Sequence, residues 1–342
     1  MAEPLAIDPY KILVVKPSSL GDIVHSLPFL NAINKRFPTA EVHWVVAKEF
    51  EGLLDGHPMI KRLRVINKDA WKKIGSVKET LGELKALFRD LKKENYDLVI
   101  DLQGLLRSGI ITAATGARIR IGFKEAREGS RLFYTHKVEG GKDIHAVDRY
   151  LKIADFLGCD MSDVRFPFPS FDSTSSPILD PSSSEDYALI VPGARWRTKR
   201  WPPENFGEIA SLLPLKSIIV GGKADRDIAD EIVAFSKRKA ISLAGKTTLK
   251  ELVEVIRGAR LVISNDSGPM HIAAALGIPV FAIFGPTDAV RTGPYGKRHR
   301  IIRENISCAP CFKTQCENMR CMKNLSVEKV FGIIRSDLQQ LL

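Results

Sequence analysis

Short apolar runs alternate along the chain with longer segments in which apolar residues recur at helical spacing. Residues 11–15 form the first apolar run, and Ile23, Leu27, Leu30 and Ile33 fall on one face of a helix expected over residues 21–36. Further strands are expected at residues 41–46 and 97–100, and further helices at residues 77–93, 104–114 and 145–157. This alternation predicts an α/β domain whose parallel sheet carries helices on both faces.

A segment rich in proline and serine, residues 166–184, interrupts this pattern. A second series of apolar runs follows it, at residues 187–191, 217–220, 241–243, 261–264 and 279–284. We therefore expect an N-terminal domain over residues 1–170, a linker over 171–184 and a second α/β domain over 185–325. A last helix within residues 326–342 is expected to pack back on the N-terminal domain.

The polar turn after the apolar run 261–264 is the first candidate site. Ser267, Gly268 and Pro269 there precede a run of small residues that ends at Gly277. A proline suits the first helical position, and the free amides of a first turn bind anions such as phosphate. His271 lies three residues into this helix, where a binding role and a packing role are both open. An ordinary capped helix has the same sequence signature.

The turn after the first apolar run carries a carboxylate, Asp22. It is either an ordinary first-turn acid that favours the helix dipole or a general base for a sugar hydroxyl. Ligands of doubly wound sheets bind at the carboxyl ends of the strands. Since both turns follow strands, we expect two such domains to face each other across a cleft.

Basic residues gather in three places in a chain of net charge +11, namely residues 61–73, 118–137 and 195–200. Such clusters attract a phosphorylated substrate or an anionic membrane surface. In the third cluster, Lys199 is placed to neutralise a departing nucleotide diphosphate, whereas Trp201 is expected in the core. No nucleic-acid-binding module is recognisable, so no nucleic-acid partner is expected.

Several classes are disfavoured by missing patterns. Neither half has G-x-G-x-x-G after its first strand, and G-x-x-x-x-G-K-[ST] does not occur, which argues against a nicotinamide dehydrogenase and a P-loop NTPase. No run of about twenty apolar residues occurs, and residues 1–10 do not resemble a secretory signal. The expected location is the cytoplasm.

Four of the five cysteines, Cys308, Cys311, Cys316 and Cys321, follow a C-x2-C-x4-C-x4-C spacing. Four thiolates so close in sequence are able to hold a structural metal, but the spacers differ from the usual zinc patterns. A reduced structural loop is the default interpretation, and no metal is expected at the candidate active site.

Taken together, several motifs resemble those of the family 9 glycosyltransferases, the ADP-heptose:lipopolysaccharide heptosyltransferases. The resemblance covers nearly the whole chain and is carried by Lys16–Pro28, Asp101–Ser108, Ala126–Gly129, His145–Arg149, Lys199–Pro202 and Asn265–His271. It implies a GT-B fold of two Rossmann-like domains, and inverting transfer of heptose from ADP-heptose to Kdo-lipid A without a metal or other cofactor. It also implies a peripheral location on the cytoplasmic face of the inner membrane.

The resemblance also assigns roles to single residues. Asp22 matches the family's base and Lys199 its phosphate-binding lysine. Donor-binding positions are Ala194, Arg195, Lys199, Thr247, Asp266, Ser267, Gly268 and His271. An acidic donor contact falls near Asp225 or Arg226. Acceptor-binding positions are Ser19, Gly21, Lys61, Arg62, Arg64, Gln103 and Arg127.

Three alternatives stay open at this point. The first turn resembles enzymes that add the first heptose, whereas the cysteine segment resembles enzymes that add the second. A non-catalytic protein that binds a nucleotide or lipid A has the same anion-binding features. An oxidoreductase on the same fold class is disfavoured by the missing glycine fingerprint.

Overall fold

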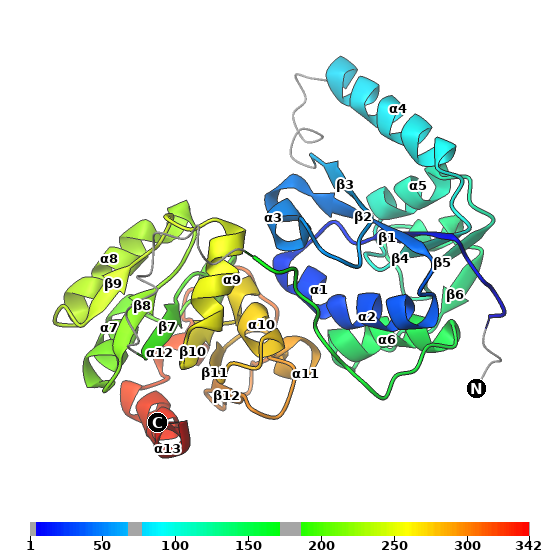
Figure 1. The fold of residues 1–342 in the computed structure, drawn as a ribbon. Coiled ribbons are helices and arrows are strands. Elements are labelled where there is room, and N and C mark those ends of the chain that lie inside the picture. Colours follow the sequence, from blue (N-terminus) through cyan, green and yellow to red (C-terminus); the bar gives the residue numbers. More distant parts are fainter. Residues whose placement is uncertain (1–4, 68–76, 172–185, 342) are drawn as a thin grey trace. The chain divides into compact units, whose positions relative to one another are not determined.

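The structure is a computed structural model that describes residues 5–67, 77–171 and 186–341 (Figure 1). The chain divides into two compact units, residues 1–170 and 171–342, which are described separately below. Lys68, Lys72 and Lys73 of the first basic cluster lie outside the described residues, as does the expected linker apart from Phe171.

The first unit is built on a six-stranded parallel sheet of order β3-β2-β1-β4-β5-β6. Its strands are β1 (Lys11–Val15), β2 (Glu41–Ala47), β3 (Arg62–Ile66), β4 (Leu98–Asp101), β5 (Ile119–Phe123) and β6 (His136–Val138). This is the strand order of a Rossmann fold, in which the chain reverses its direction of winding between β1 and β4. The carboxyl ends of those two strands are therefore where a ligand is expected.

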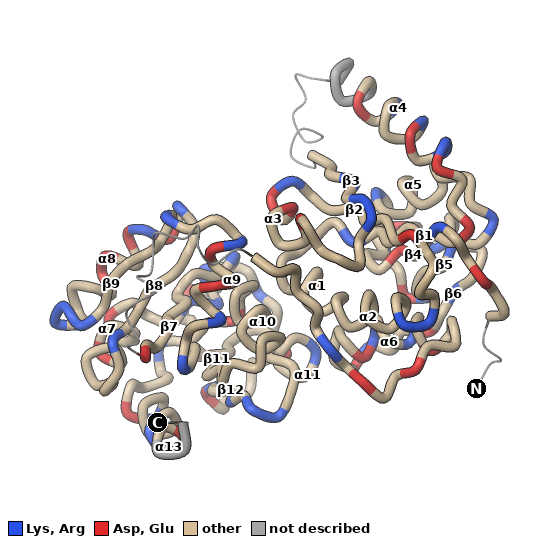
Figure 2. Tube along the Cα trace, in the orientation of Figure 1, with Lys and Arg blue, Asp and Glu red and all other residues tan. Residues whose placement is uncertain are grey.

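Helices cover both faces of this sheet, with α4 and α5 on one face and α1, α2 and α6 on the other (Figure 1). These helices are α1 (Leu20–His25), α2 (Leu27–Arg36), α4 (Val77–Lys93), α5 (Leu106–Ala114) and α6 (Ala146–Phe156), and shorter turns are α3 (Glu51–Leu54) and the 3-10 helix η4 (Ser130–Phe133). Beneath α4 and α5, Leu13, Val45 and Val99 of the strands pack with Leu91 and Ile111 of the helices. Charged positions of both signs alternate along α4 (Figure 2).

The helix expected over residues 21–36 is two helices, because α1 ends at His25 and α2 begins at Leu27. Ser26 lies between them at φ −90° and ψ −4°. Pro28 explains the break, since it has no N–H to donate and its ring clashes with the carbonyl four residues earlier. The first turn, which carries Asp22, thus belongs to a separate short helix.

The second unit repeats the architecture with a parallel sheet of order β12-β11-β10-β7-β8-β9. Its strands are β7 (Tyr187–Val191), β8 (Lys216–Ile219), β9 (Ala240–Ser242), β10 (Leu261–Asn265), β11 (Val280–Phe284) and β12 (Arg300–Arg303). Its helices are α7 (Pro203–Leu212), α8 (Arg226–Phe235), α9 (Leu249–Arg257), α10 (Gly268–Ala275), α11 (Ala289–Thr292), α12 (Arg320–Lys323) and α13 (Val327–Leu341).

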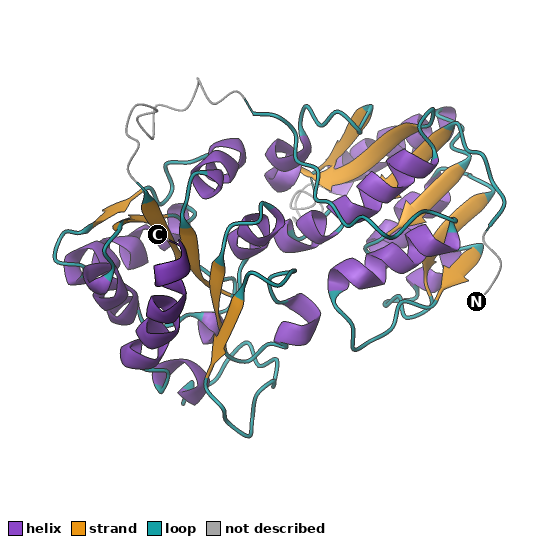
Figure 3. Ribbon diagram, turned by 60° about the horizontal axis from the view of Figure 1, so that its bottom comes forward, coloured by secondary structure: helices purple, strands orange, loops and turns teal. Residues whose placement is uncertain are grey.

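Figure 3 shows helices layered against the strands of each unit. The change in winding direction now falls between β7 and β10. Two parallel Rossmann-like sheets confirm the predicted α/β fold class with two doubly wound domains.

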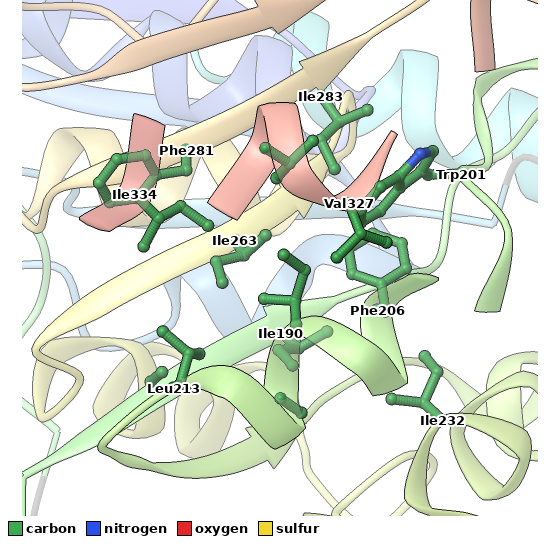
Figure 4. Packing of buried hydrophobic residues seen from close by; sticks show 14 of the residues in the cluster. Ile190, Trp201, Phe206, Leu213, Ile232, Ile263, Phe281, Ile283, Val327 and Ile334 are labelled. Atoms are coloured by element: carbon green, nitrogen blue, oxygen red, sulfur yellow. The ribbon is translucent and has the colours of Figure 1, made fainter. Parts of the chain in front are cut away.

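One face of the second sheet is buried under α7, α8 and α13 (Figure 4). Ile190, Ile263 and Phe281 of the strands meet Phe206 of α7 and Ile334 of α13 in this core. Trp201 is also buried here, and its indole N–H donates to the Leu325 carbonyl at 2.9 Å. The final helix therefore packs on α7 of the second unit, although its sequence led us to expect it on the N-terminal domain.

Candidate functional site

In the first unit, Asp22 lies on α1 directly beyond the carboxyl end of β1. One carboxylate oxygen, Oδ2, accepts the backbone N–H of Ser19 at 3.0 Å and the Ser19 hydroxyl at 2.8 Å. This pair of hydrogen bonds fixes the carboxylate at the amino end of the helix, where a negative charge is favoured. The side chain keeps 38% of its surface exposed, so it remains accessible to a substrate.

The second oxygen of Asp22, Oδ1, faces two groups that sequence reasoning did not assign. The Tyr150 hydroxyl on α6 donates to it at 3.4 Å, and the Lys16 ammonium nitrogen lies 4.0 Å away. Lys16 is only 2% exposed, donates to the Leu102 carbonyl at 3.4 Å and lies 5.0 Å from the centre of the Tyr150 ring. Burial lowers the pKa of Lys16, while the charges of Asp22 and Asp101 oppose that shift.

A buried carboxylate, Asp101, organises the neighbouring turn after β4. It accepts the backbone N–H groups of Gln103 at 2.8 Å and Gly104 at 3.0 Å, and the Tyr134 hydroxyl at 2.7 Å. Burial raises the pKa of Asp101, and these hydrogen bonds oppose the shift. The turn that Asp101 holds is itself tied to the Asp22 turn, because Gln103 Oε1 accepts the backbone N–H of Ser18 at 3.2 Å.

The structure thus brings together several of the expected acceptor-binding residues around Asp22. Ser19 and Gly21 belong to its own turn, and Gln103 comes from the adjoining one. Arg127 is joined to that second turn, because its backbone N–H donates to the Gly104 carbonyl at 2.8 Å. Ser19 and Arg127 are exposed and Gln103 is half-buried, and all three belong to turns at the edge of the sheet that carries the carboxylate.

Arg62 and Arg64 are not brought to this edge. They lie on β3, and both of their guanidinium groups form ion pairs with the Glu94 carboxylate, the one from Arg62 at 2.8 Å. The Lys11 ammonium pairs with the same carboxylate at 3.1 Å. Glu94 precedes β4, and Lys11 begins β1, so the cluster lies at the amino end of the sheet, opposite Asp22. Lys61, also exposed, directly precedes β3. An acceptor role for these three residues stays a prediction without a geometric link to Asp22.

In the second unit, Lys199 and Asp266 meet at the change in winding direction. The Lys199 ammonium donates to Asp266 Oδ2 at 2.9 Å and to the Asp266 carbonyl at 3.3 Å. Thr287, which follows β11, donates its hydroxyl to the same carboxylate oxygen at 2.7 Å. Lys199 also lies 5.0 Å from the centre of the Trp196 ring. Its position is therefore fixed from two sides.

The turn before α10 is fixed by Asn265. Its side-chain amide donates to the Pro192 carbonyl at 2.7 Å and accepts the Trp201 backbone N–H at 3.2 Å, which joins the turns after β7 and β10. Ser267 is the N-cap and Gly268 the first helical residue, so Pro269 takes the second helical position, one residue later than its sequence context led us to expect. His271 is 6% exposed on the same helix. The free N–H groups of this first turn create a positive end suited to a phosphate.

The neighbouring turns place the remaining donor candidates at the same edge of the sheet. Ala194 is buried and Arg195 is exposed in the turn after β7, and Thr247 follows β9. Asp225, which the sequence left unresolved from Arg226, packs against this turn: a Cβ atom built on Gly193 would come within 2.6 Å of its carboxylate.

Arg226 instead donates to the Gly245 carbonyl at 3.2 Å. Asp225 is therefore the acidic candidate at this edge.

The cysteine segment adjoins the Lys199 turn, because the Thr198 hydroxyl donates to the Lys313 carbonyl at 2.8 Å. All five cysteines are free thiols. Burial, together with nearby Cys311 and Cys308, raises the pKa of Cys321. Among the residues that the structure describes, no group of three or more histidine, cysteine or acidic side chains is arranged to hold a metal ion. Over those same residues, no helix combines the length and apolar character needed to cross a membrane.

Comparison with known proteins gives a consistent result over nearly the whole chain. Residues 84–322 match the family described as glycosyltransferase family 9 (heptosyltransferase). Lipopolysaccharide heptosyltransferase 1 of Pseudomonas aeruginosa is 31% identical over 320 residues, covering 90% of this chain and 87% of that protein. Lipooligosaccharide heptosyltransferase 2 of Haemophilus ducreyi is 30% identical over 318 residues, covering 86% and 88% respectively. The solved structure of the E. coli heptosyltransferase WaaC with ADP-2-deoxy-2-fluoro heptose is similar at a TM-score of 0.78 and 26% identity, covering 96% of this chain and 99% of that one.

Proposed function

We propose, since this chain belongs to glycosyltransferase family 9 (heptosyltransferase), that it transfers a heptose from ADP-heptose to the Kdo sugar of Kdo-lipid A. The observation that carries the proposal is the presence of a fixed carboxylate at one switch point and a fixed cation beside a helix amino end at the other. The first suits a hydroxyl nucleophile, and the second suits a diphosphate leaving group. The proposal requires the two bound substrates to meet.

Asp22 is the proposed general base. Its Oδ2 accepts two hydrogen bonds from Ser19, and we assign the proton transfer to Oδ1, the oxygen that faces Tyr150 and Lys16. The acceptor oxygen then attacks the anomeric carbon of the heptose as the bond to the diphosphate breaks. One displacement from the face opposite the leaving group inverts the configuration at that carbon.

Lys199 and the amino end of α10 are proposed to stabilise the departing ADP. Asp266 keeps the Lys199 ammonium at this edge, and the first-turn N–H groups of α10 add donors that need not reorganise during the reaction. Arg195, Thr247, Asp225 and His271 are proposed to hold other parts of the donor. In this account the charge of the diphosphate is balanced by side chains and backbone, so the reaction is proposed to proceed without added metal.

The identity of the acceptor distinguishes the two groups of relatives, since one group is named for transfer of the first heptose and the other for transfer of the second. Proteins named heptosyltransferase 1 and heptosyltransferase 2 are similarly identical to this chain, at 31% and 30%. We favour the first heptose, because the first turn and its Asp22 resemble that group. The enzyme is proposed to act at the cytoplasmic face of the inner membrane, where a lipid-linked acceptor is accessible.

One assay decides among these possibilities. The protein is incubated with ADP-heptose and either Kdo-lipid A or its singly heptosylated product, and both lipids are followed by mass spectrometry. A gain of one heptose on Kdo-lipid A supports the proposal, whereas extension of the heptosylated lipid alone shows second-heptose transfer. Binding of ADP without extension of either lipid shows a non-catalytic nucleotide-binding protein.

A further inference from the structure

Three large apolar side chains are exposed on neighbouring parts of the first unit. Leu132 on η4 is 80% exposed, and Leu106 and Ile110 on α5 are 42% and 38% exposed. The two elements are packed together, since a Cβ atom built on Gly109 of α5 would come within 2.6 Å of the Phe133 ring on η4. Exposed apolar groups gathered on adjoining elements are typical of an interaction surface.

The charged groups around these side chains are mostly basic. Arg107, Arg127 and Arg131 are all exposed. An acidic residue also lies here, Glu128, whose carboxylate accepts the Leu106 backbone N–H at 3.2 Å and so is partly engaged at the start of α5. We call the three apolar and three basic side chains together the α5/η4 patch: Leu106, Ile110, Leu132, Arg107, Arg127 and Arg131.

The patch adjoins the edge of the sheet that carries Asp22. Leu106 is the first residue of α5, close in sequence to Gln103, which accepts the Ser18 backbone N–H beside the catalytic turn. Arg127 is hydrogen-bonded through its backbone to Gly104 in that same connection. A partner bound at the patch therefore lies beside the proposed acceptor site.

We propose that the α5/η4 patch docks the protein on the surface of an anionic phospholipid bilayer. Apolar side chains that lie among arginines suit a bilayer surface. The apolar side chains enter the boundary of the acyl chains, and the arginines contact the lipid phosphates. A stable interface with a second copy of the chain buries about 800 Å² on each partner, whereas this patch presents three large apolar side chains together with three arginines. The charge of the patch also opposes self-association, because two copies would bring arginines together.

The test uses the full chain in co-sedimentation with vesicles of phosphatidylcholine alone and vesicles in which about a third of the lipid is phosphatidylglycerol. Two variants change the patch. One combines Leu132→Ser with Ile110→Ser, and the other carries Arg131→Glu alone. Leu212→Ser is the matched control, because Leu212 is 46% exposed on α7 of the second unit. We expect about a tenfold loss of binding to anionic vesicles for each patch variant, little change for the control, and weaker binding at higher salt.

Binding equal to that of the unchanged protein in the patch variants overturns the proposal, as does equal binding to neutral vesicles. A concentration-dependent dimer in analytical ultracentrifugation, lost in the patch variants, would assign the surface to a second copy instead. The choice of a bilayer as the partner rests on the proposed function, but vesicle binding is measured independently of heptose transfer. Vesicle binding in a protein that fails to transfer heptose supports the patch and refutes only the enzyme activity.

Discussion

Replacing Lys16 by methionine tests how the buried lysine acts on Asp22. The Lys16 ammonium lies 4.0 Å from Asp22 Oδ1. Two unit charges at this distance interact by about 1 kcal/mol in water and about 4 kcal/mol at the effective dielectric constant of a protein surface. Because the Asp22 side chain is 38% exposed, we place the loss near the lower end. A loss of about 1.4 kcal/mol corresponds to about one pH unit in the ionisation of the carboxylate.

The sign of the change follows from which form of Asp22 the lysine favours. Protonated Lys16 favours the carboxylate, so its removal lets Asp22 take up a proton at higher pH. The acidic limb of kcat/KM, which reports loss of the ionised base, is therefore expected to move upward by about one pH unit in Lys16→Met. Since burial lowers the pKa of Lys16, this support is itself lost as pH rises through that lowered value.

The assay measures kcat/KM for ADP-heptose and Kdo-lipid A from about pH 3 to 8, a range that includes the ordinary titration of an aspartate near pH 4 and an upward shift of about one unit. Thermal melting accompanies it, and the melting temperature is expected not to fall. An apolar side chain in place of a buried charge is often tolerated, and Asp22 retains its bonds from Ser19. A well-folded Lys16→Met protein whose acidic limb stays in place would refute the electrostatic role of Lys16.

Three further predictions concern other clusters. Glu94→Gln removes a carboxylate whose pKa is lowered by Lys11 and the nearby arginines despite its burial. We therefore expect the variant to lose about 2 kcal/mol in the free energy of unfolding at neutral pH. This loss is expected to shrink below about pH 4, where the carboxylate is protonated, and urea denaturation across pH measures it. Gly193→Ala sets a Cβ atom 2.6 Å from Asp225 and is expected to weaken ADP binding about tenfold in calorimetry, whereas Gly222→Ala, whose Cβ would lie 3.7 Å away, is expected to leave it unchanged. Lys199→Met is expected to weaken ADP binding by at least tenfold and to flatten its dependence on salt; an unchanged dissociation constant would remove the lysine from the donor site.

Much of the fold follows from the sequence because its central strands are continuous apolar runs. β1, β4, β7 and β10 are buried on both faces, and the runs that predicted them lie within a residue or two of their observed bounds. Four of the strands that the structure describes were not predicted, namely β3, β5, β6 and β12, whereas the edge strand β9 was. β3 and β5 alternate arginine with apolar residues, which hid their strand character within what looked like basic surface clusters.

The candidate site was predictable where a single turn carries it. Asp22 and the Ser267–Gly268 turn follow strands directly, so local sequence locates them. Lys16 and Tyr150 were not predicted as a pair, because their contact depends on how α6 packs beside α1 rather than on spacing along the chain. The same limit explains Arg62 and Arg64, whose pairing with Glu94 comes from a distant segment.

The most direct test of the account compares Asp22→Asn with the unchanged protein in heptose transfer to Kdo-lipid A, with ADP-heptose affinity measured in parallel by calorimetry. Asparagine keeps the shape of the side chain but is unable to accept the hydroxyl proton as a carboxylate does. We expect kcat to fall by a factor of roughly 100 or more while the dissociation constant for the donor stays within about twofold. Turnover close to that of the unchanged protein would contradict the central claim that Asp22 is the base.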